Sequence, residues 1–236
     1  ESGDQILNVN QLLFDEISKP IDFTLNKGNK VVLYSKDSKI SSKFYEIING
    51  INNNYKGEFQ WGSTISKSYL PLNNDSYFNK NINLIDWLRQ WANNDEEREE
   101  VFIRGFLGKM IFSGEEALKS CSVLSGGEKV RCVLSKMMME RSNFLIMDEP
   151  TNHLDIESII RLERWLSNYS GAVVLVSHDR LFLDVSTNRT IEVAFSKIND
   201  YKASYTKYLT LREDRVEKQI QAKKNQDKYI EETKEL

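Results

Sequence analysis

Two adjacent carboxylates, Asp148 and Glu149, follow directly after the apolar run "FLIM". An uninterrupted apolar run of this kind is typical of a strand that is buried on both faces of a parallel sheet. Ligands of open parallel sheets bind at the carboxyl ends of the strands. One carboxylate there can hold the water shell of a magnesium ion, and the other can polarise a water molecule for attack on phosphorus. Taken alone, the pair is as compatible with acidic residues that solvate a strand end.

A serine followed by two glycines opens the next candidate site, "VLSGGEK" at residues 123–129. Ser125 is placed to cap a helix. Gly126 and Gly127 allow backbone N–H groups and the positive end of the helix dipole to approach a phosphate closely. The pattern therefore indicates an anion site at a helix N-terminus.

A histidine completes the series. His178 lies in "VSHDR", just after the second apolar run, "AVVLV". Because parallel strands end at the same edge of a sheet, we expect His178 beside Glu149. A lone histidine at such a place is more often a packed or capping residue, but here it stands in an ordered series of motifs.

The elements that must position these residues follow from the apolar patterns. Short strand-like runs come first and suit a small antiparallel region beside the first core strand, at residues 5–14, 21–25, 30–35 and 57–70. Residues 83–120 have helical spacing and predict a small helical insertion. A helix, a buried strand, a helix and a second buried strand then alternate, at residues 127–141, 144–148, 158–169 and 172–177. This alternation predicts an α/β fold with a mainly parallel sheet.

The composition sets the broad class. The chain has 236 residues, of which 40% are hydrophobic and 28% charged, with a formal net charge of −3, so we expect a globular protein without a global attraction to nucleic acid. Cys121 and Cys132 lack the paired spacing of a zinc site or a disulfide framework, which favours a reducing compartment. No apolar run approaches the roughly 20 residues of a membrane span, and we expect no membrane contact and a cytoplasmic location. The first residue is Glu1, so we expect a piece of a longer protein.

Together, "LSGGEK", "LIMDEPTNHLD" and "VSHD" closely resemble the ATP-binding cassette domain, which has the P-loop NTPase fold. "EPTNHLD" and "LSGGEKVR" are the forms of the ABC-F family, whose members carry two cassettes in tandem and act on the ribosome. The resemblance covers residues 4–196, and "DWLRQW" and "RGFLGKMIFSGEE" look most similar to a C-terminal cassette. It implies a mainly parallel core sheet, an antiparallel β subdomain and a helical subdomain at about 80–120. We expect the cassette at 1–196 and a charged helical extension or linker at 197–236.

The resemblance also implies ATP and Mg²⁺ as cofactors. It implies that three residues act on the nucleotide bound by this chain itself. Asp148 is then the magnesium-site carboxylate, Glu149 the catalytic base that orients water, and His178 the contact to the γ-phosphate.

Other residues are implied to contact a nucleotide held by a second cassette, the expected partner. They are the signature residues Ser125, Gly126, Gly127 and Glu128, together with Leu154 and Asp155 of the loop that crosses the interface between cassettes.

The family's glycine-rich phosphate loop falls on "YSKDSKISSK" at residues 34–43, which contains no glycine. Its glycines fall on Ser35, Ser38 and Ile40, its lysine on Ser41, and its magnesium-binding hydroxyl on Ser42. Because glycine allows the sharp turn and close approach of a phosphate cradle, we expect weak ATP binding in cis. Lys43 points to a different helix face from Ser41 and is a poor substitute for the lysine.

Two further family positions depart from the pattern or stay open. Leu72 stands near the place of a glutamine that senses magnesium and water. Phe14 is a candidate for stacking on adenine, and a core aromatic is at least as good an interpretation.

Three functions remain open. The first is a cassette of an ABC-F ATPase that acts on the ribosome with rRNA and tRNA contacts, with weak ATP binding and hydrolysis in cis and a signature that serves the partner cassette. The second is a catalytically silent cassette that only completes the partner's site. The third is the ATPase subunit of a membrane transporter. The charged segment after residue 197 is either a linker that reaches RNA or a solvated helix, because its Lys, Arg and Glu nearly balance.

Overall fold

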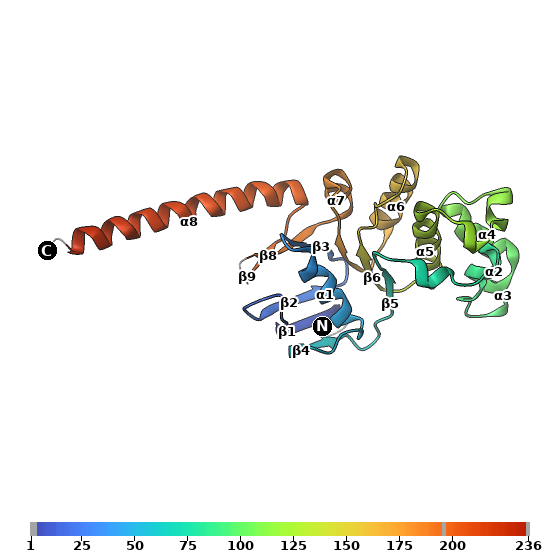
Figure 1. Cartoon of the computed structure of the whole chain (residues 1–236), viewed down its shortest axis with the longest axis horizontal. Helices are drawn as coiled ribbons and strands as arrows, with labels where there is room; N and C mark the ends of the chain where they lie inside the picture. The colour runs from blue at the N-terminus through green and yellow to red at the C-terminus, as the bar shows by residue number, and fades with distance from the viewer. Residues whose placement is uncertain (1–3, 195–196, 235–236) are drawn as a thin grey trace.

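The computed structural model describes residues 4–194 and 197–234. Its chain forms two sheets and surrounding helices, which confirms the predicted α/β class (Figure 1). The larger, mainly parallel sheet lies at the centre, with the antiparallel sheet on one side of it and a group of short helices at one end (Figure 1).

The central sheet has six strands in the order β5-β6-β7-β3-β8-β9. The strands are β3 (Lys30–Ser35), β5 (Lys67–Leu70), β6 (Phe144–Asp148), β7 (Ala172–Val176), β8 (Arg189–Ala194) and β9 (Lys197–Tyr201). All neighbours pair in parallel except β8 and β9, which pair antiparallel. β6 and β7 are therefore neighbours with the same direction, and the residues that follow them meet at one edge.

The antiparallel sheet has the order β2-β1-β4, formed by β1 (Gln5–Leu13), β2 (Ile21–Asn26) and β4 (Lys56–Trp61). The sequence pattern placed residues 57–70 in this antiparallel region. The structure divides them, because Lys67–Leu70 pairs in parallel with β6 and joins the central sheet as β5.

Four helices flank the central sheet: α1 (Ser38–Ile48), α5 (Gly126–Glu140), α6 (Ile156–Asn168) and α7 (Arg180–Ser186). The helical insertion predicted at residues 83–120 is present as short pieces: α2 (Leu84–Arg89), α3 (Asp95–Arg98), α4 (Glu100–Lys109) and η2 (Gly114–Leu118). Two short 3-10 helices outside the predicted bounds flank it, η1 (Asp75–Phe78) and η3 (Cys121–Val123). These pieces, apart from α3, pack with α5 and one face of the sheet in one apolar cluster, while α1 and the antiparallel sheet pack on the other face in a second cluster.

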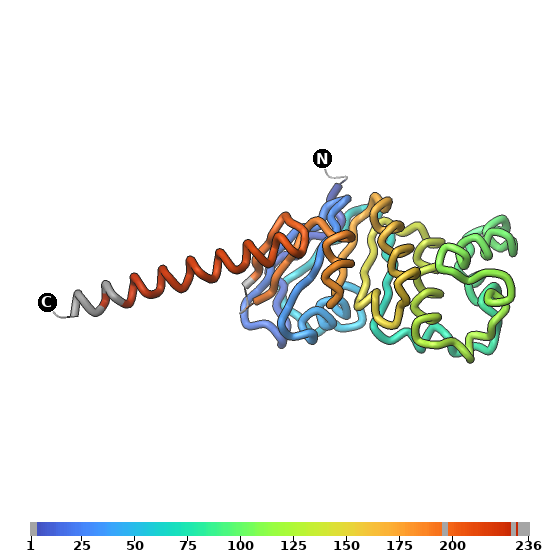
Figure 2. The backbone as a smooth tube through the Cα atoms, turned by 90° about the horizontal axis from the view of Figure 1, so that it is seen from above, coloured from blue at the N-terminus to red at the C-terminus, as the bar shows by residue number. Residues whose placement is uncertain are grey.

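The last helix, α8 (Tyr205–Lys234), packs on the body only at its start and then extends away from it (Figures 1 and 2). Tyr205 and Tyr208 are buried, and the fully buried Glu192 of β8 pairs with Arg212 at 2.6 Å and Arg215 at 2.7 Å. The helical extension was predicted to begin at residue 197. In the structure α8 begins at Tyr205, because Lys197–Tyr201 first forms β9 and continues the central sheet. The division into residues 1–196 and 197–236 stays a prediction.

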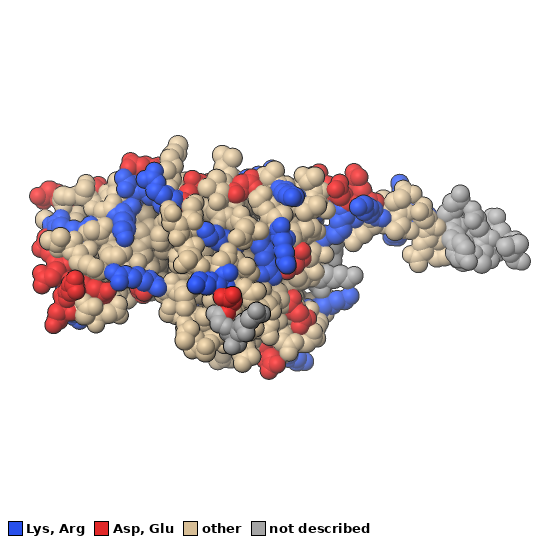
Figure 3. Space-filling view, turned by 180° about the vertical axis from the view of Figure 1, so that it is seen from behind, with Lys and Arg blue, Asp and Glu red and all other residues tan. Residues whose placement is uncertain are grey.

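Charges of both signs are mixed on the surface. Figure 3 shows Lys and Arg side chains across the middle of one face and several Asp and Glu side chains at the end that carries the short helices. This distribution agrees with the small net charge.

Candidate functional site

The carboxyl edge of the central sheet brings together the three residues expected there. Asp148 is the last residue of β6 and pairs in register with Val176 of β7, so Glu149 and His178 follow adjacent strands. The Glu149 Oε1 and His178 Nε2 atoms lie 3.2 Å apart, and the His178 backbone N–H donates to Glu149 Oε2 at 3.3 Å. The side chains of Glu149 and His178 are thus in contact within this chain.

Asp148 lies in a setting that disfavours its charge. Its side chain is buried, and burial together with the nearby Glu149 carboxylate raises the pKa of Asp148 to about 6. The Tyr45 hydroxyl is also buried, and it has no hydrogen-bond partner in the described part of the chain. Burial raises the pKa of Tyr45, and the charge of Asp148 raises it further. Two close carboxylates with little solvation suit a divalent cation.

A magnesium ion would have few protein ligands here. Within the described ranges, no group of three His, Cys, Asp or Glu side chains could hold a metal. Mg²⁺ usually takes one or two protein oxygens together with water and phosphate oxygens. Asp148 and the hydroxyl of Ser42, which is half-buried on α1, are oxygen donors of the type that could supply this small share.

The segment in place of the phosphate loop is a short turn into a helix. β3 ends at Ser35 and α1 already begins at Ser38, so only Lys36 and Asp37 lie between them. No residue from 35 to 42 has a positive φ. Asp37 caps the helix, with its Oδ1 accepting from the Lys39 N–H at 3.0 Å. The N-cap of α1 is therefore an acidic side chain, although no residue of the first turn itself is acidic.

The residues at the lysine position supply no substitute. Ser41 is buried, with 3% of its surface exposed. The Lys43 Nζ atom lies 3.2 Å from a Glu46 oxygen and 4.0 Å from a Glu16 oxygen, so its charge is already paired.

Leu72 borders the carboxylates, as expected of the glutamine position. It lies with Asp148 and Glu149 around a cavity of about 30 Å³, and its side chain is mostly exposed. An apolar side chain at this place cannot sense a metal or orient water by hydrogen bonds.

The signature segment has the helix N-terminus that the sequence predicts. Ser125 and Glu128 form a capping box, in which the Ser125 N–H donates to Glu128 Oε2 at 2.9 Å and the Glu128 N–H donates to Ser125 Oγ at 3.3 Å. Burial opposes the charge of Glu128, but the Lys119 ammonium at 2.6 Å and the Ser125 groups outweigh it and lower the pKa of Glu128 to about 2. The first turn of α5 is thus well ordered by its own side chains.

The signature glycines lie against the loop that ends at Asp155. A Cβ atom on Gly127 would lie 2.3 Å from the His153 backbone oxygen, whereas one on Gly126 would meet nothing closer than 3.6 Å. Asp155 caps α6, with its Oδ1 accepting from the Ser158 N–H at 2.7 Å. The structure thus places the signature and this loop side by side, with Leu154 packed against the core cluster.

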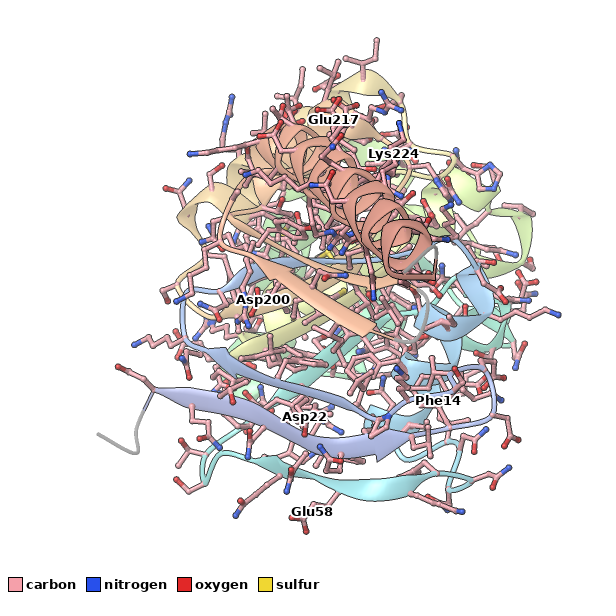
Figure 4. The ribbon with its side chains drawn as sticks, turned by 90° about the vertical axis from the view of Figure 1, so that its left-hand side faces the viewer. Phe14, Asp22, Glu58, Asp200, Glu217 and Lys224 are labelled. Carbon is pink, nitrogen blue, oxygen red and sulfur yellow. The ribbon has the colours of Figure 1, made fainter. Side chains whose placement is uncertain are left out.

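Phe14 does not fit adenine stacking. It is buried in the cluster that includes the antiparallel sheet, on the side of the molecule away from α8 (Figure 4). The alternative, a core aromatic, is confirmed.

Sequence reasoning missed three residues near the phosphate loop. Tyr34, Arg180 and Tyr205 line a cleft of about 630 Å³ beside it, together with His178 and loop serines. Arg180 could have been suspected from "SHDR". Tyr205 carries no signal, because its place depends on how α8 packs on β8.

Comparison with known proteins identifies the family. A family model described as "ABC transporter" matches residues 18–152, and another with the same description matches residues 191–236. The uncharacterized ABC transporter ATP-binding protein YkpA of Bacillus subtilis is 42% identical over 89% of this chain and 39% of its own length. ABC transporter F family member 5 of Arabidopsis thaliana is 32% identical over 88% of this chain and 30% of its own length. The chain thus spans well under half of these relatives.

Solved structures agree on the fold. The ATP-binding subunit of an ABC transporter matches with a TM-score of 0.73 at 15% identity, over 84% of this chain and 90% of its own. The dimeric, post-hydrolysis cassette MJ0796 bound to ADP and Pi matches with a TM-score of 0.66 at 15% identity, over 84% of this chain and 98% of its own. No helix among the described residues is long and apolar enough to cross a membrane. The family match covers more than half of the sequence, and the chain belongs to the ABC transporter family as an ATP-binding cassette domain.

Proposed function

We propose that this cassette is part of an ABC-F ATPase that acts on the ribosome during translation. The similarity to Arabidopsis ABC transporter F family members 5 and 2, at 32% and 30% identity, supports this branch of the family. The segments "DWLRQW" and "RGFLGKMIFSGEE" support the C-terminal position in a tandem protein. The gene sequence upstream of Glu1 tests that position, since it must then encode another cassette. A second cassette found only after Leu236 would contradict it.

The proposal assigns different roles to the two cassettes of the full-length protein. The observation that carries it is the contrast between two helix starts: α5 opens with two glycines and a capping box, and α1 opens without glycine and with Asp37 as its N-cap. The signature residues Ser125, Gly126, Gly127 and Glu128 then contact ATP held by the partner, while this chain's own loop binds ATP weakly. A preformed helix N-terminus favours the partner's phosphates.

The cis residues keep the roles that the family pattern gives them. Magnesium-bound ATP, when present, supplies the phosphoanhydride bond that is hydrolysed. Glu149 would orient the attacking water, and His178, whose Nε2 lies 3.2 Å from Glu149 Oε1, would contact the γ-phosphate. Asp148 and Ser42 would hold the metal, but without a phosphate cradle we expect slow turnover at this site.

The loop geometry favours a second candidate function, a catalytically silent cassette. It retains a structural role and the signature but hydrolyses nothing itself. Steady turnover by the 236-residue chain, with submillimolar ATP binding, would rule this candidate out.

Ribosome cofractionation of the full-length protein tests the leading proposal. With a non-hydrolysable ATP analogue, or in the Glu149→Gln variant with ATP, the protein should sediment with ribosomes and crosslink to rRNA or tRNA in the cytoplasm. Glu157→Gln, on the exposed start of α6, is the matched control and should behave as wild type. Absence of Glu149→Gln from the ribosome fractions, or copurification with a membrane protein, would contradict the proposal and favour a transporter subunit.

A further inference from the structure

A second cavity lies at the opposite edge of the central sheet from His178 and the carboxylates. It has a volume of about 480 Å³, and its lining includes residues 64–65, 141–143 and 169–171, in the loops before β5, β6 and β7, together with side chains near the ends of α5 and α6. β6 and β7 have five residues each, so at about 3.3 Å per residue the two edges lie roughly 16 Å apart. This amino-edge cavity is therefore separate from the nucleotide site.

Contacts between the loops hold the amino-edge cavity in shape. The Asn143 side-chain amide donates to the Thr64 carbonyl at 2.8 Å, and the Tyr169 hydroxyl donates to the Ser142 carbonyl at 2.7 Å. Gly171 permits a close approach of these loops, because a Cβ atom there would lie 2.4 Å from the Asn143 carbonyl oxygen. The cavity is thus preformed, and a ligand would not have to order its walls.

The apolar part of the lining is largely aromatic. The Trp165 and Tyr169 rings lie 6.0 Å apart between centroids, with their planes tilted by 59°. Ile6, Ile65 and Met138 add aliphatic surface. A flat ring fits such a surface, because aromatic groups pack well in tilted and offset arrangements.

Several hydrogen-bond donors of this cavity have no acceptor in the described part of the chain. Lys27 makes no ion pair there, and the Trp165 indole N–H and the Ser142 and Thr64 hydroxyls make no hydrogen bond. Ser142 is buried, with 6% of its surface exposed. A buried donor without a partner is costly, so these groups favour a ligand that supplies acceptor atoms.

The charges of the cavity favour an anion. Among the described residues that line it, Lys27 and Arg141 are cations and none is a carboxylate. Arg141 is only loosely paired, because its Nη1 atom lies 4.0 Å from Glu97 Oε1. The negative end of the α6 dipole is offset by Lys30, whose ammonium donates to two of the last carbonyls of that helix.

We propose that the amino-edge cavity binds a small aromatic anion, such as an aromatic carboxylate, with its ring against Trp165 and Tyr169 and its charge near Lys27. The inference goes beyond the proposed function, because it requires neither a nucleotide nor magnesium nor a partner cassette. It assigns a ligand class to the edge of the sheet that the family motifs do not reach.

Calorimetric titration of the 236-residue chain with 1-naphthoate tests the proposal, with 1-naphthalenemethanol as the uncharged probe of the same ring. We expect a dissociation constant of about 1 mM or below for naphthoate, and roughly tenfold weaker binding of the alcohol. Lys27→Ala should weaken naphthoate binding roughly fivefold to tenfold. Lys19→Ala, an exposed lysine outside the cavity, is the matched control and should bind as wild type.

The indole N–H signals in a heteronuclear NMR spectrum show where naphthoate binds. The signal of Trp165, assigned by its absence in Trp165→Phe, should shift on titration, whereas those of Trp61, Trp87 and Trp91 should stay in place. Excess ADP in EDTA should leave the naphthoate affinity unchanged.

Four results would overturn the proposal. They are no binding of naphthoate, equal affinity for the alcohol, wild-type affinity in Lys27→Ala, and displacement by ADP or an unshifted Trp165 signal. None of them depends on ribosome cofractionation, so failure of the proposed function is distinguishable.

Discussion

The starts of α1 and α5 are both helix N-termini that a polar side chain caps. At α5, Ser125 caps the helix with a neutral hydroxyl and two glycines follow. At α1, Asp37 caps the helix with a carboxylate and the residues that follow all have side chains. Both helix starts thus carry an acidic side chain, Asp37 as the cap of α1 and Glu128 in the first turn of α5, and they differ in the glycines that only α5 has.

The comparison of the two helix starts separates two properties of a phosphate site, the helix cap and the presence of glycine. Both helices are well capped, so capping alone does not decide whether a helix end can receive a ligand. We expect the close approach that glycine permits to decide it, and of these two helix starts only α5 has glycines.

Rebuilding the phosphate loop should have the largest effect. Ser35→Gly, Ser38→Gly, Ile40→Gly and Ser41→Lys together should raise ATP affinity by about 100-fold or more, because several charge-assisted contacts are regained at about 1.5–3 kcal/mol each. Equilibrium binding of labelled ATP measures it. Ser41→Lys alone should gain much less, since α1 would still begin at Ser38. An equal gain from the single change would show that the cradle is not what limits binding.

Removing the charge of Asp148 should stabilise the protein. The pKa of Asp148 is raised from 3.8 to about 6, so its ionised form opposes folding above pH 6 and the penalty disappears as the pH falls toward 3.8. Asp148→Asn should therefore raise the free energy of unfolding by up to about 3 kcal/mol at pH 8, and by little near pH 4. Urea unfolding in EDTA measures this, with Asp214→Asn on α8 as the neutral control. A stability gain independent of pH would contradict the electrostatic cause.

The two signature glycines should respond differently. Gly127→Ala should lower the free energy of unfolding by about 2 kcal/mol, because its Cβ would lie 2.3 Å from the His153 backbone oxygen. Gly126→Ala has room for its Cβ and should change stability by less than about 0.5 kcal/mol. Thermal unfolding compares them. Equal losses would mean that the glycines are not required by the packing of this loop.

The caps themselves should have the smallest effect. Ser125→Ala and Asp37→Ala should each cost about 1 kcal/mol in urea unfolding, the usual cost of losing a helix cap. Glu128, the partner of Ser125 in the capping box, makes part of the stability depend on pH. Because the pKa of Glu128 is lowered to about 2, its contribution to the free energy of unfolding is complete above pH 4.5 and is lost as the pH falls toward 2. The difference between wild type and Glu128→Gln should shrink over that range. A constant difference would argue against an ionised Glu128 in the box.

Much of the fold could be predicted because its strongest signals are local. The runs before Asp148 and His178 are fully apolar, which identifies buried parallel strands and places both residues at one edge. The strand Lys67–Leu70 was predicted in the wrong sheet, because the choice between sheets depends on a partner, Phe144–Met147, far along the chain. Local periodicity does not contain that information.

The site was predictable where motifs have fixed spacing and not where it depends on packing. Ser125, Glu149 and His178 lie as their spacing predicts. The early start of α1 could have been found from Asp37, since aspartate is a preferred cap. Arg180 and Tyr205 meet only because α7 and α8 pack together, which no motif encodes.

Titration of the 236-residue chain with labelled ATP and Mg²⁺ tests the central claim. The claim is that the segment at residues 34–43 binds ATP weakly because it lacks the glycines that the signature segment retains. We predict a dissociation constant in the millimolar range and negligible turnover. Submillimolar binding with steady hydrolysis would contradict it.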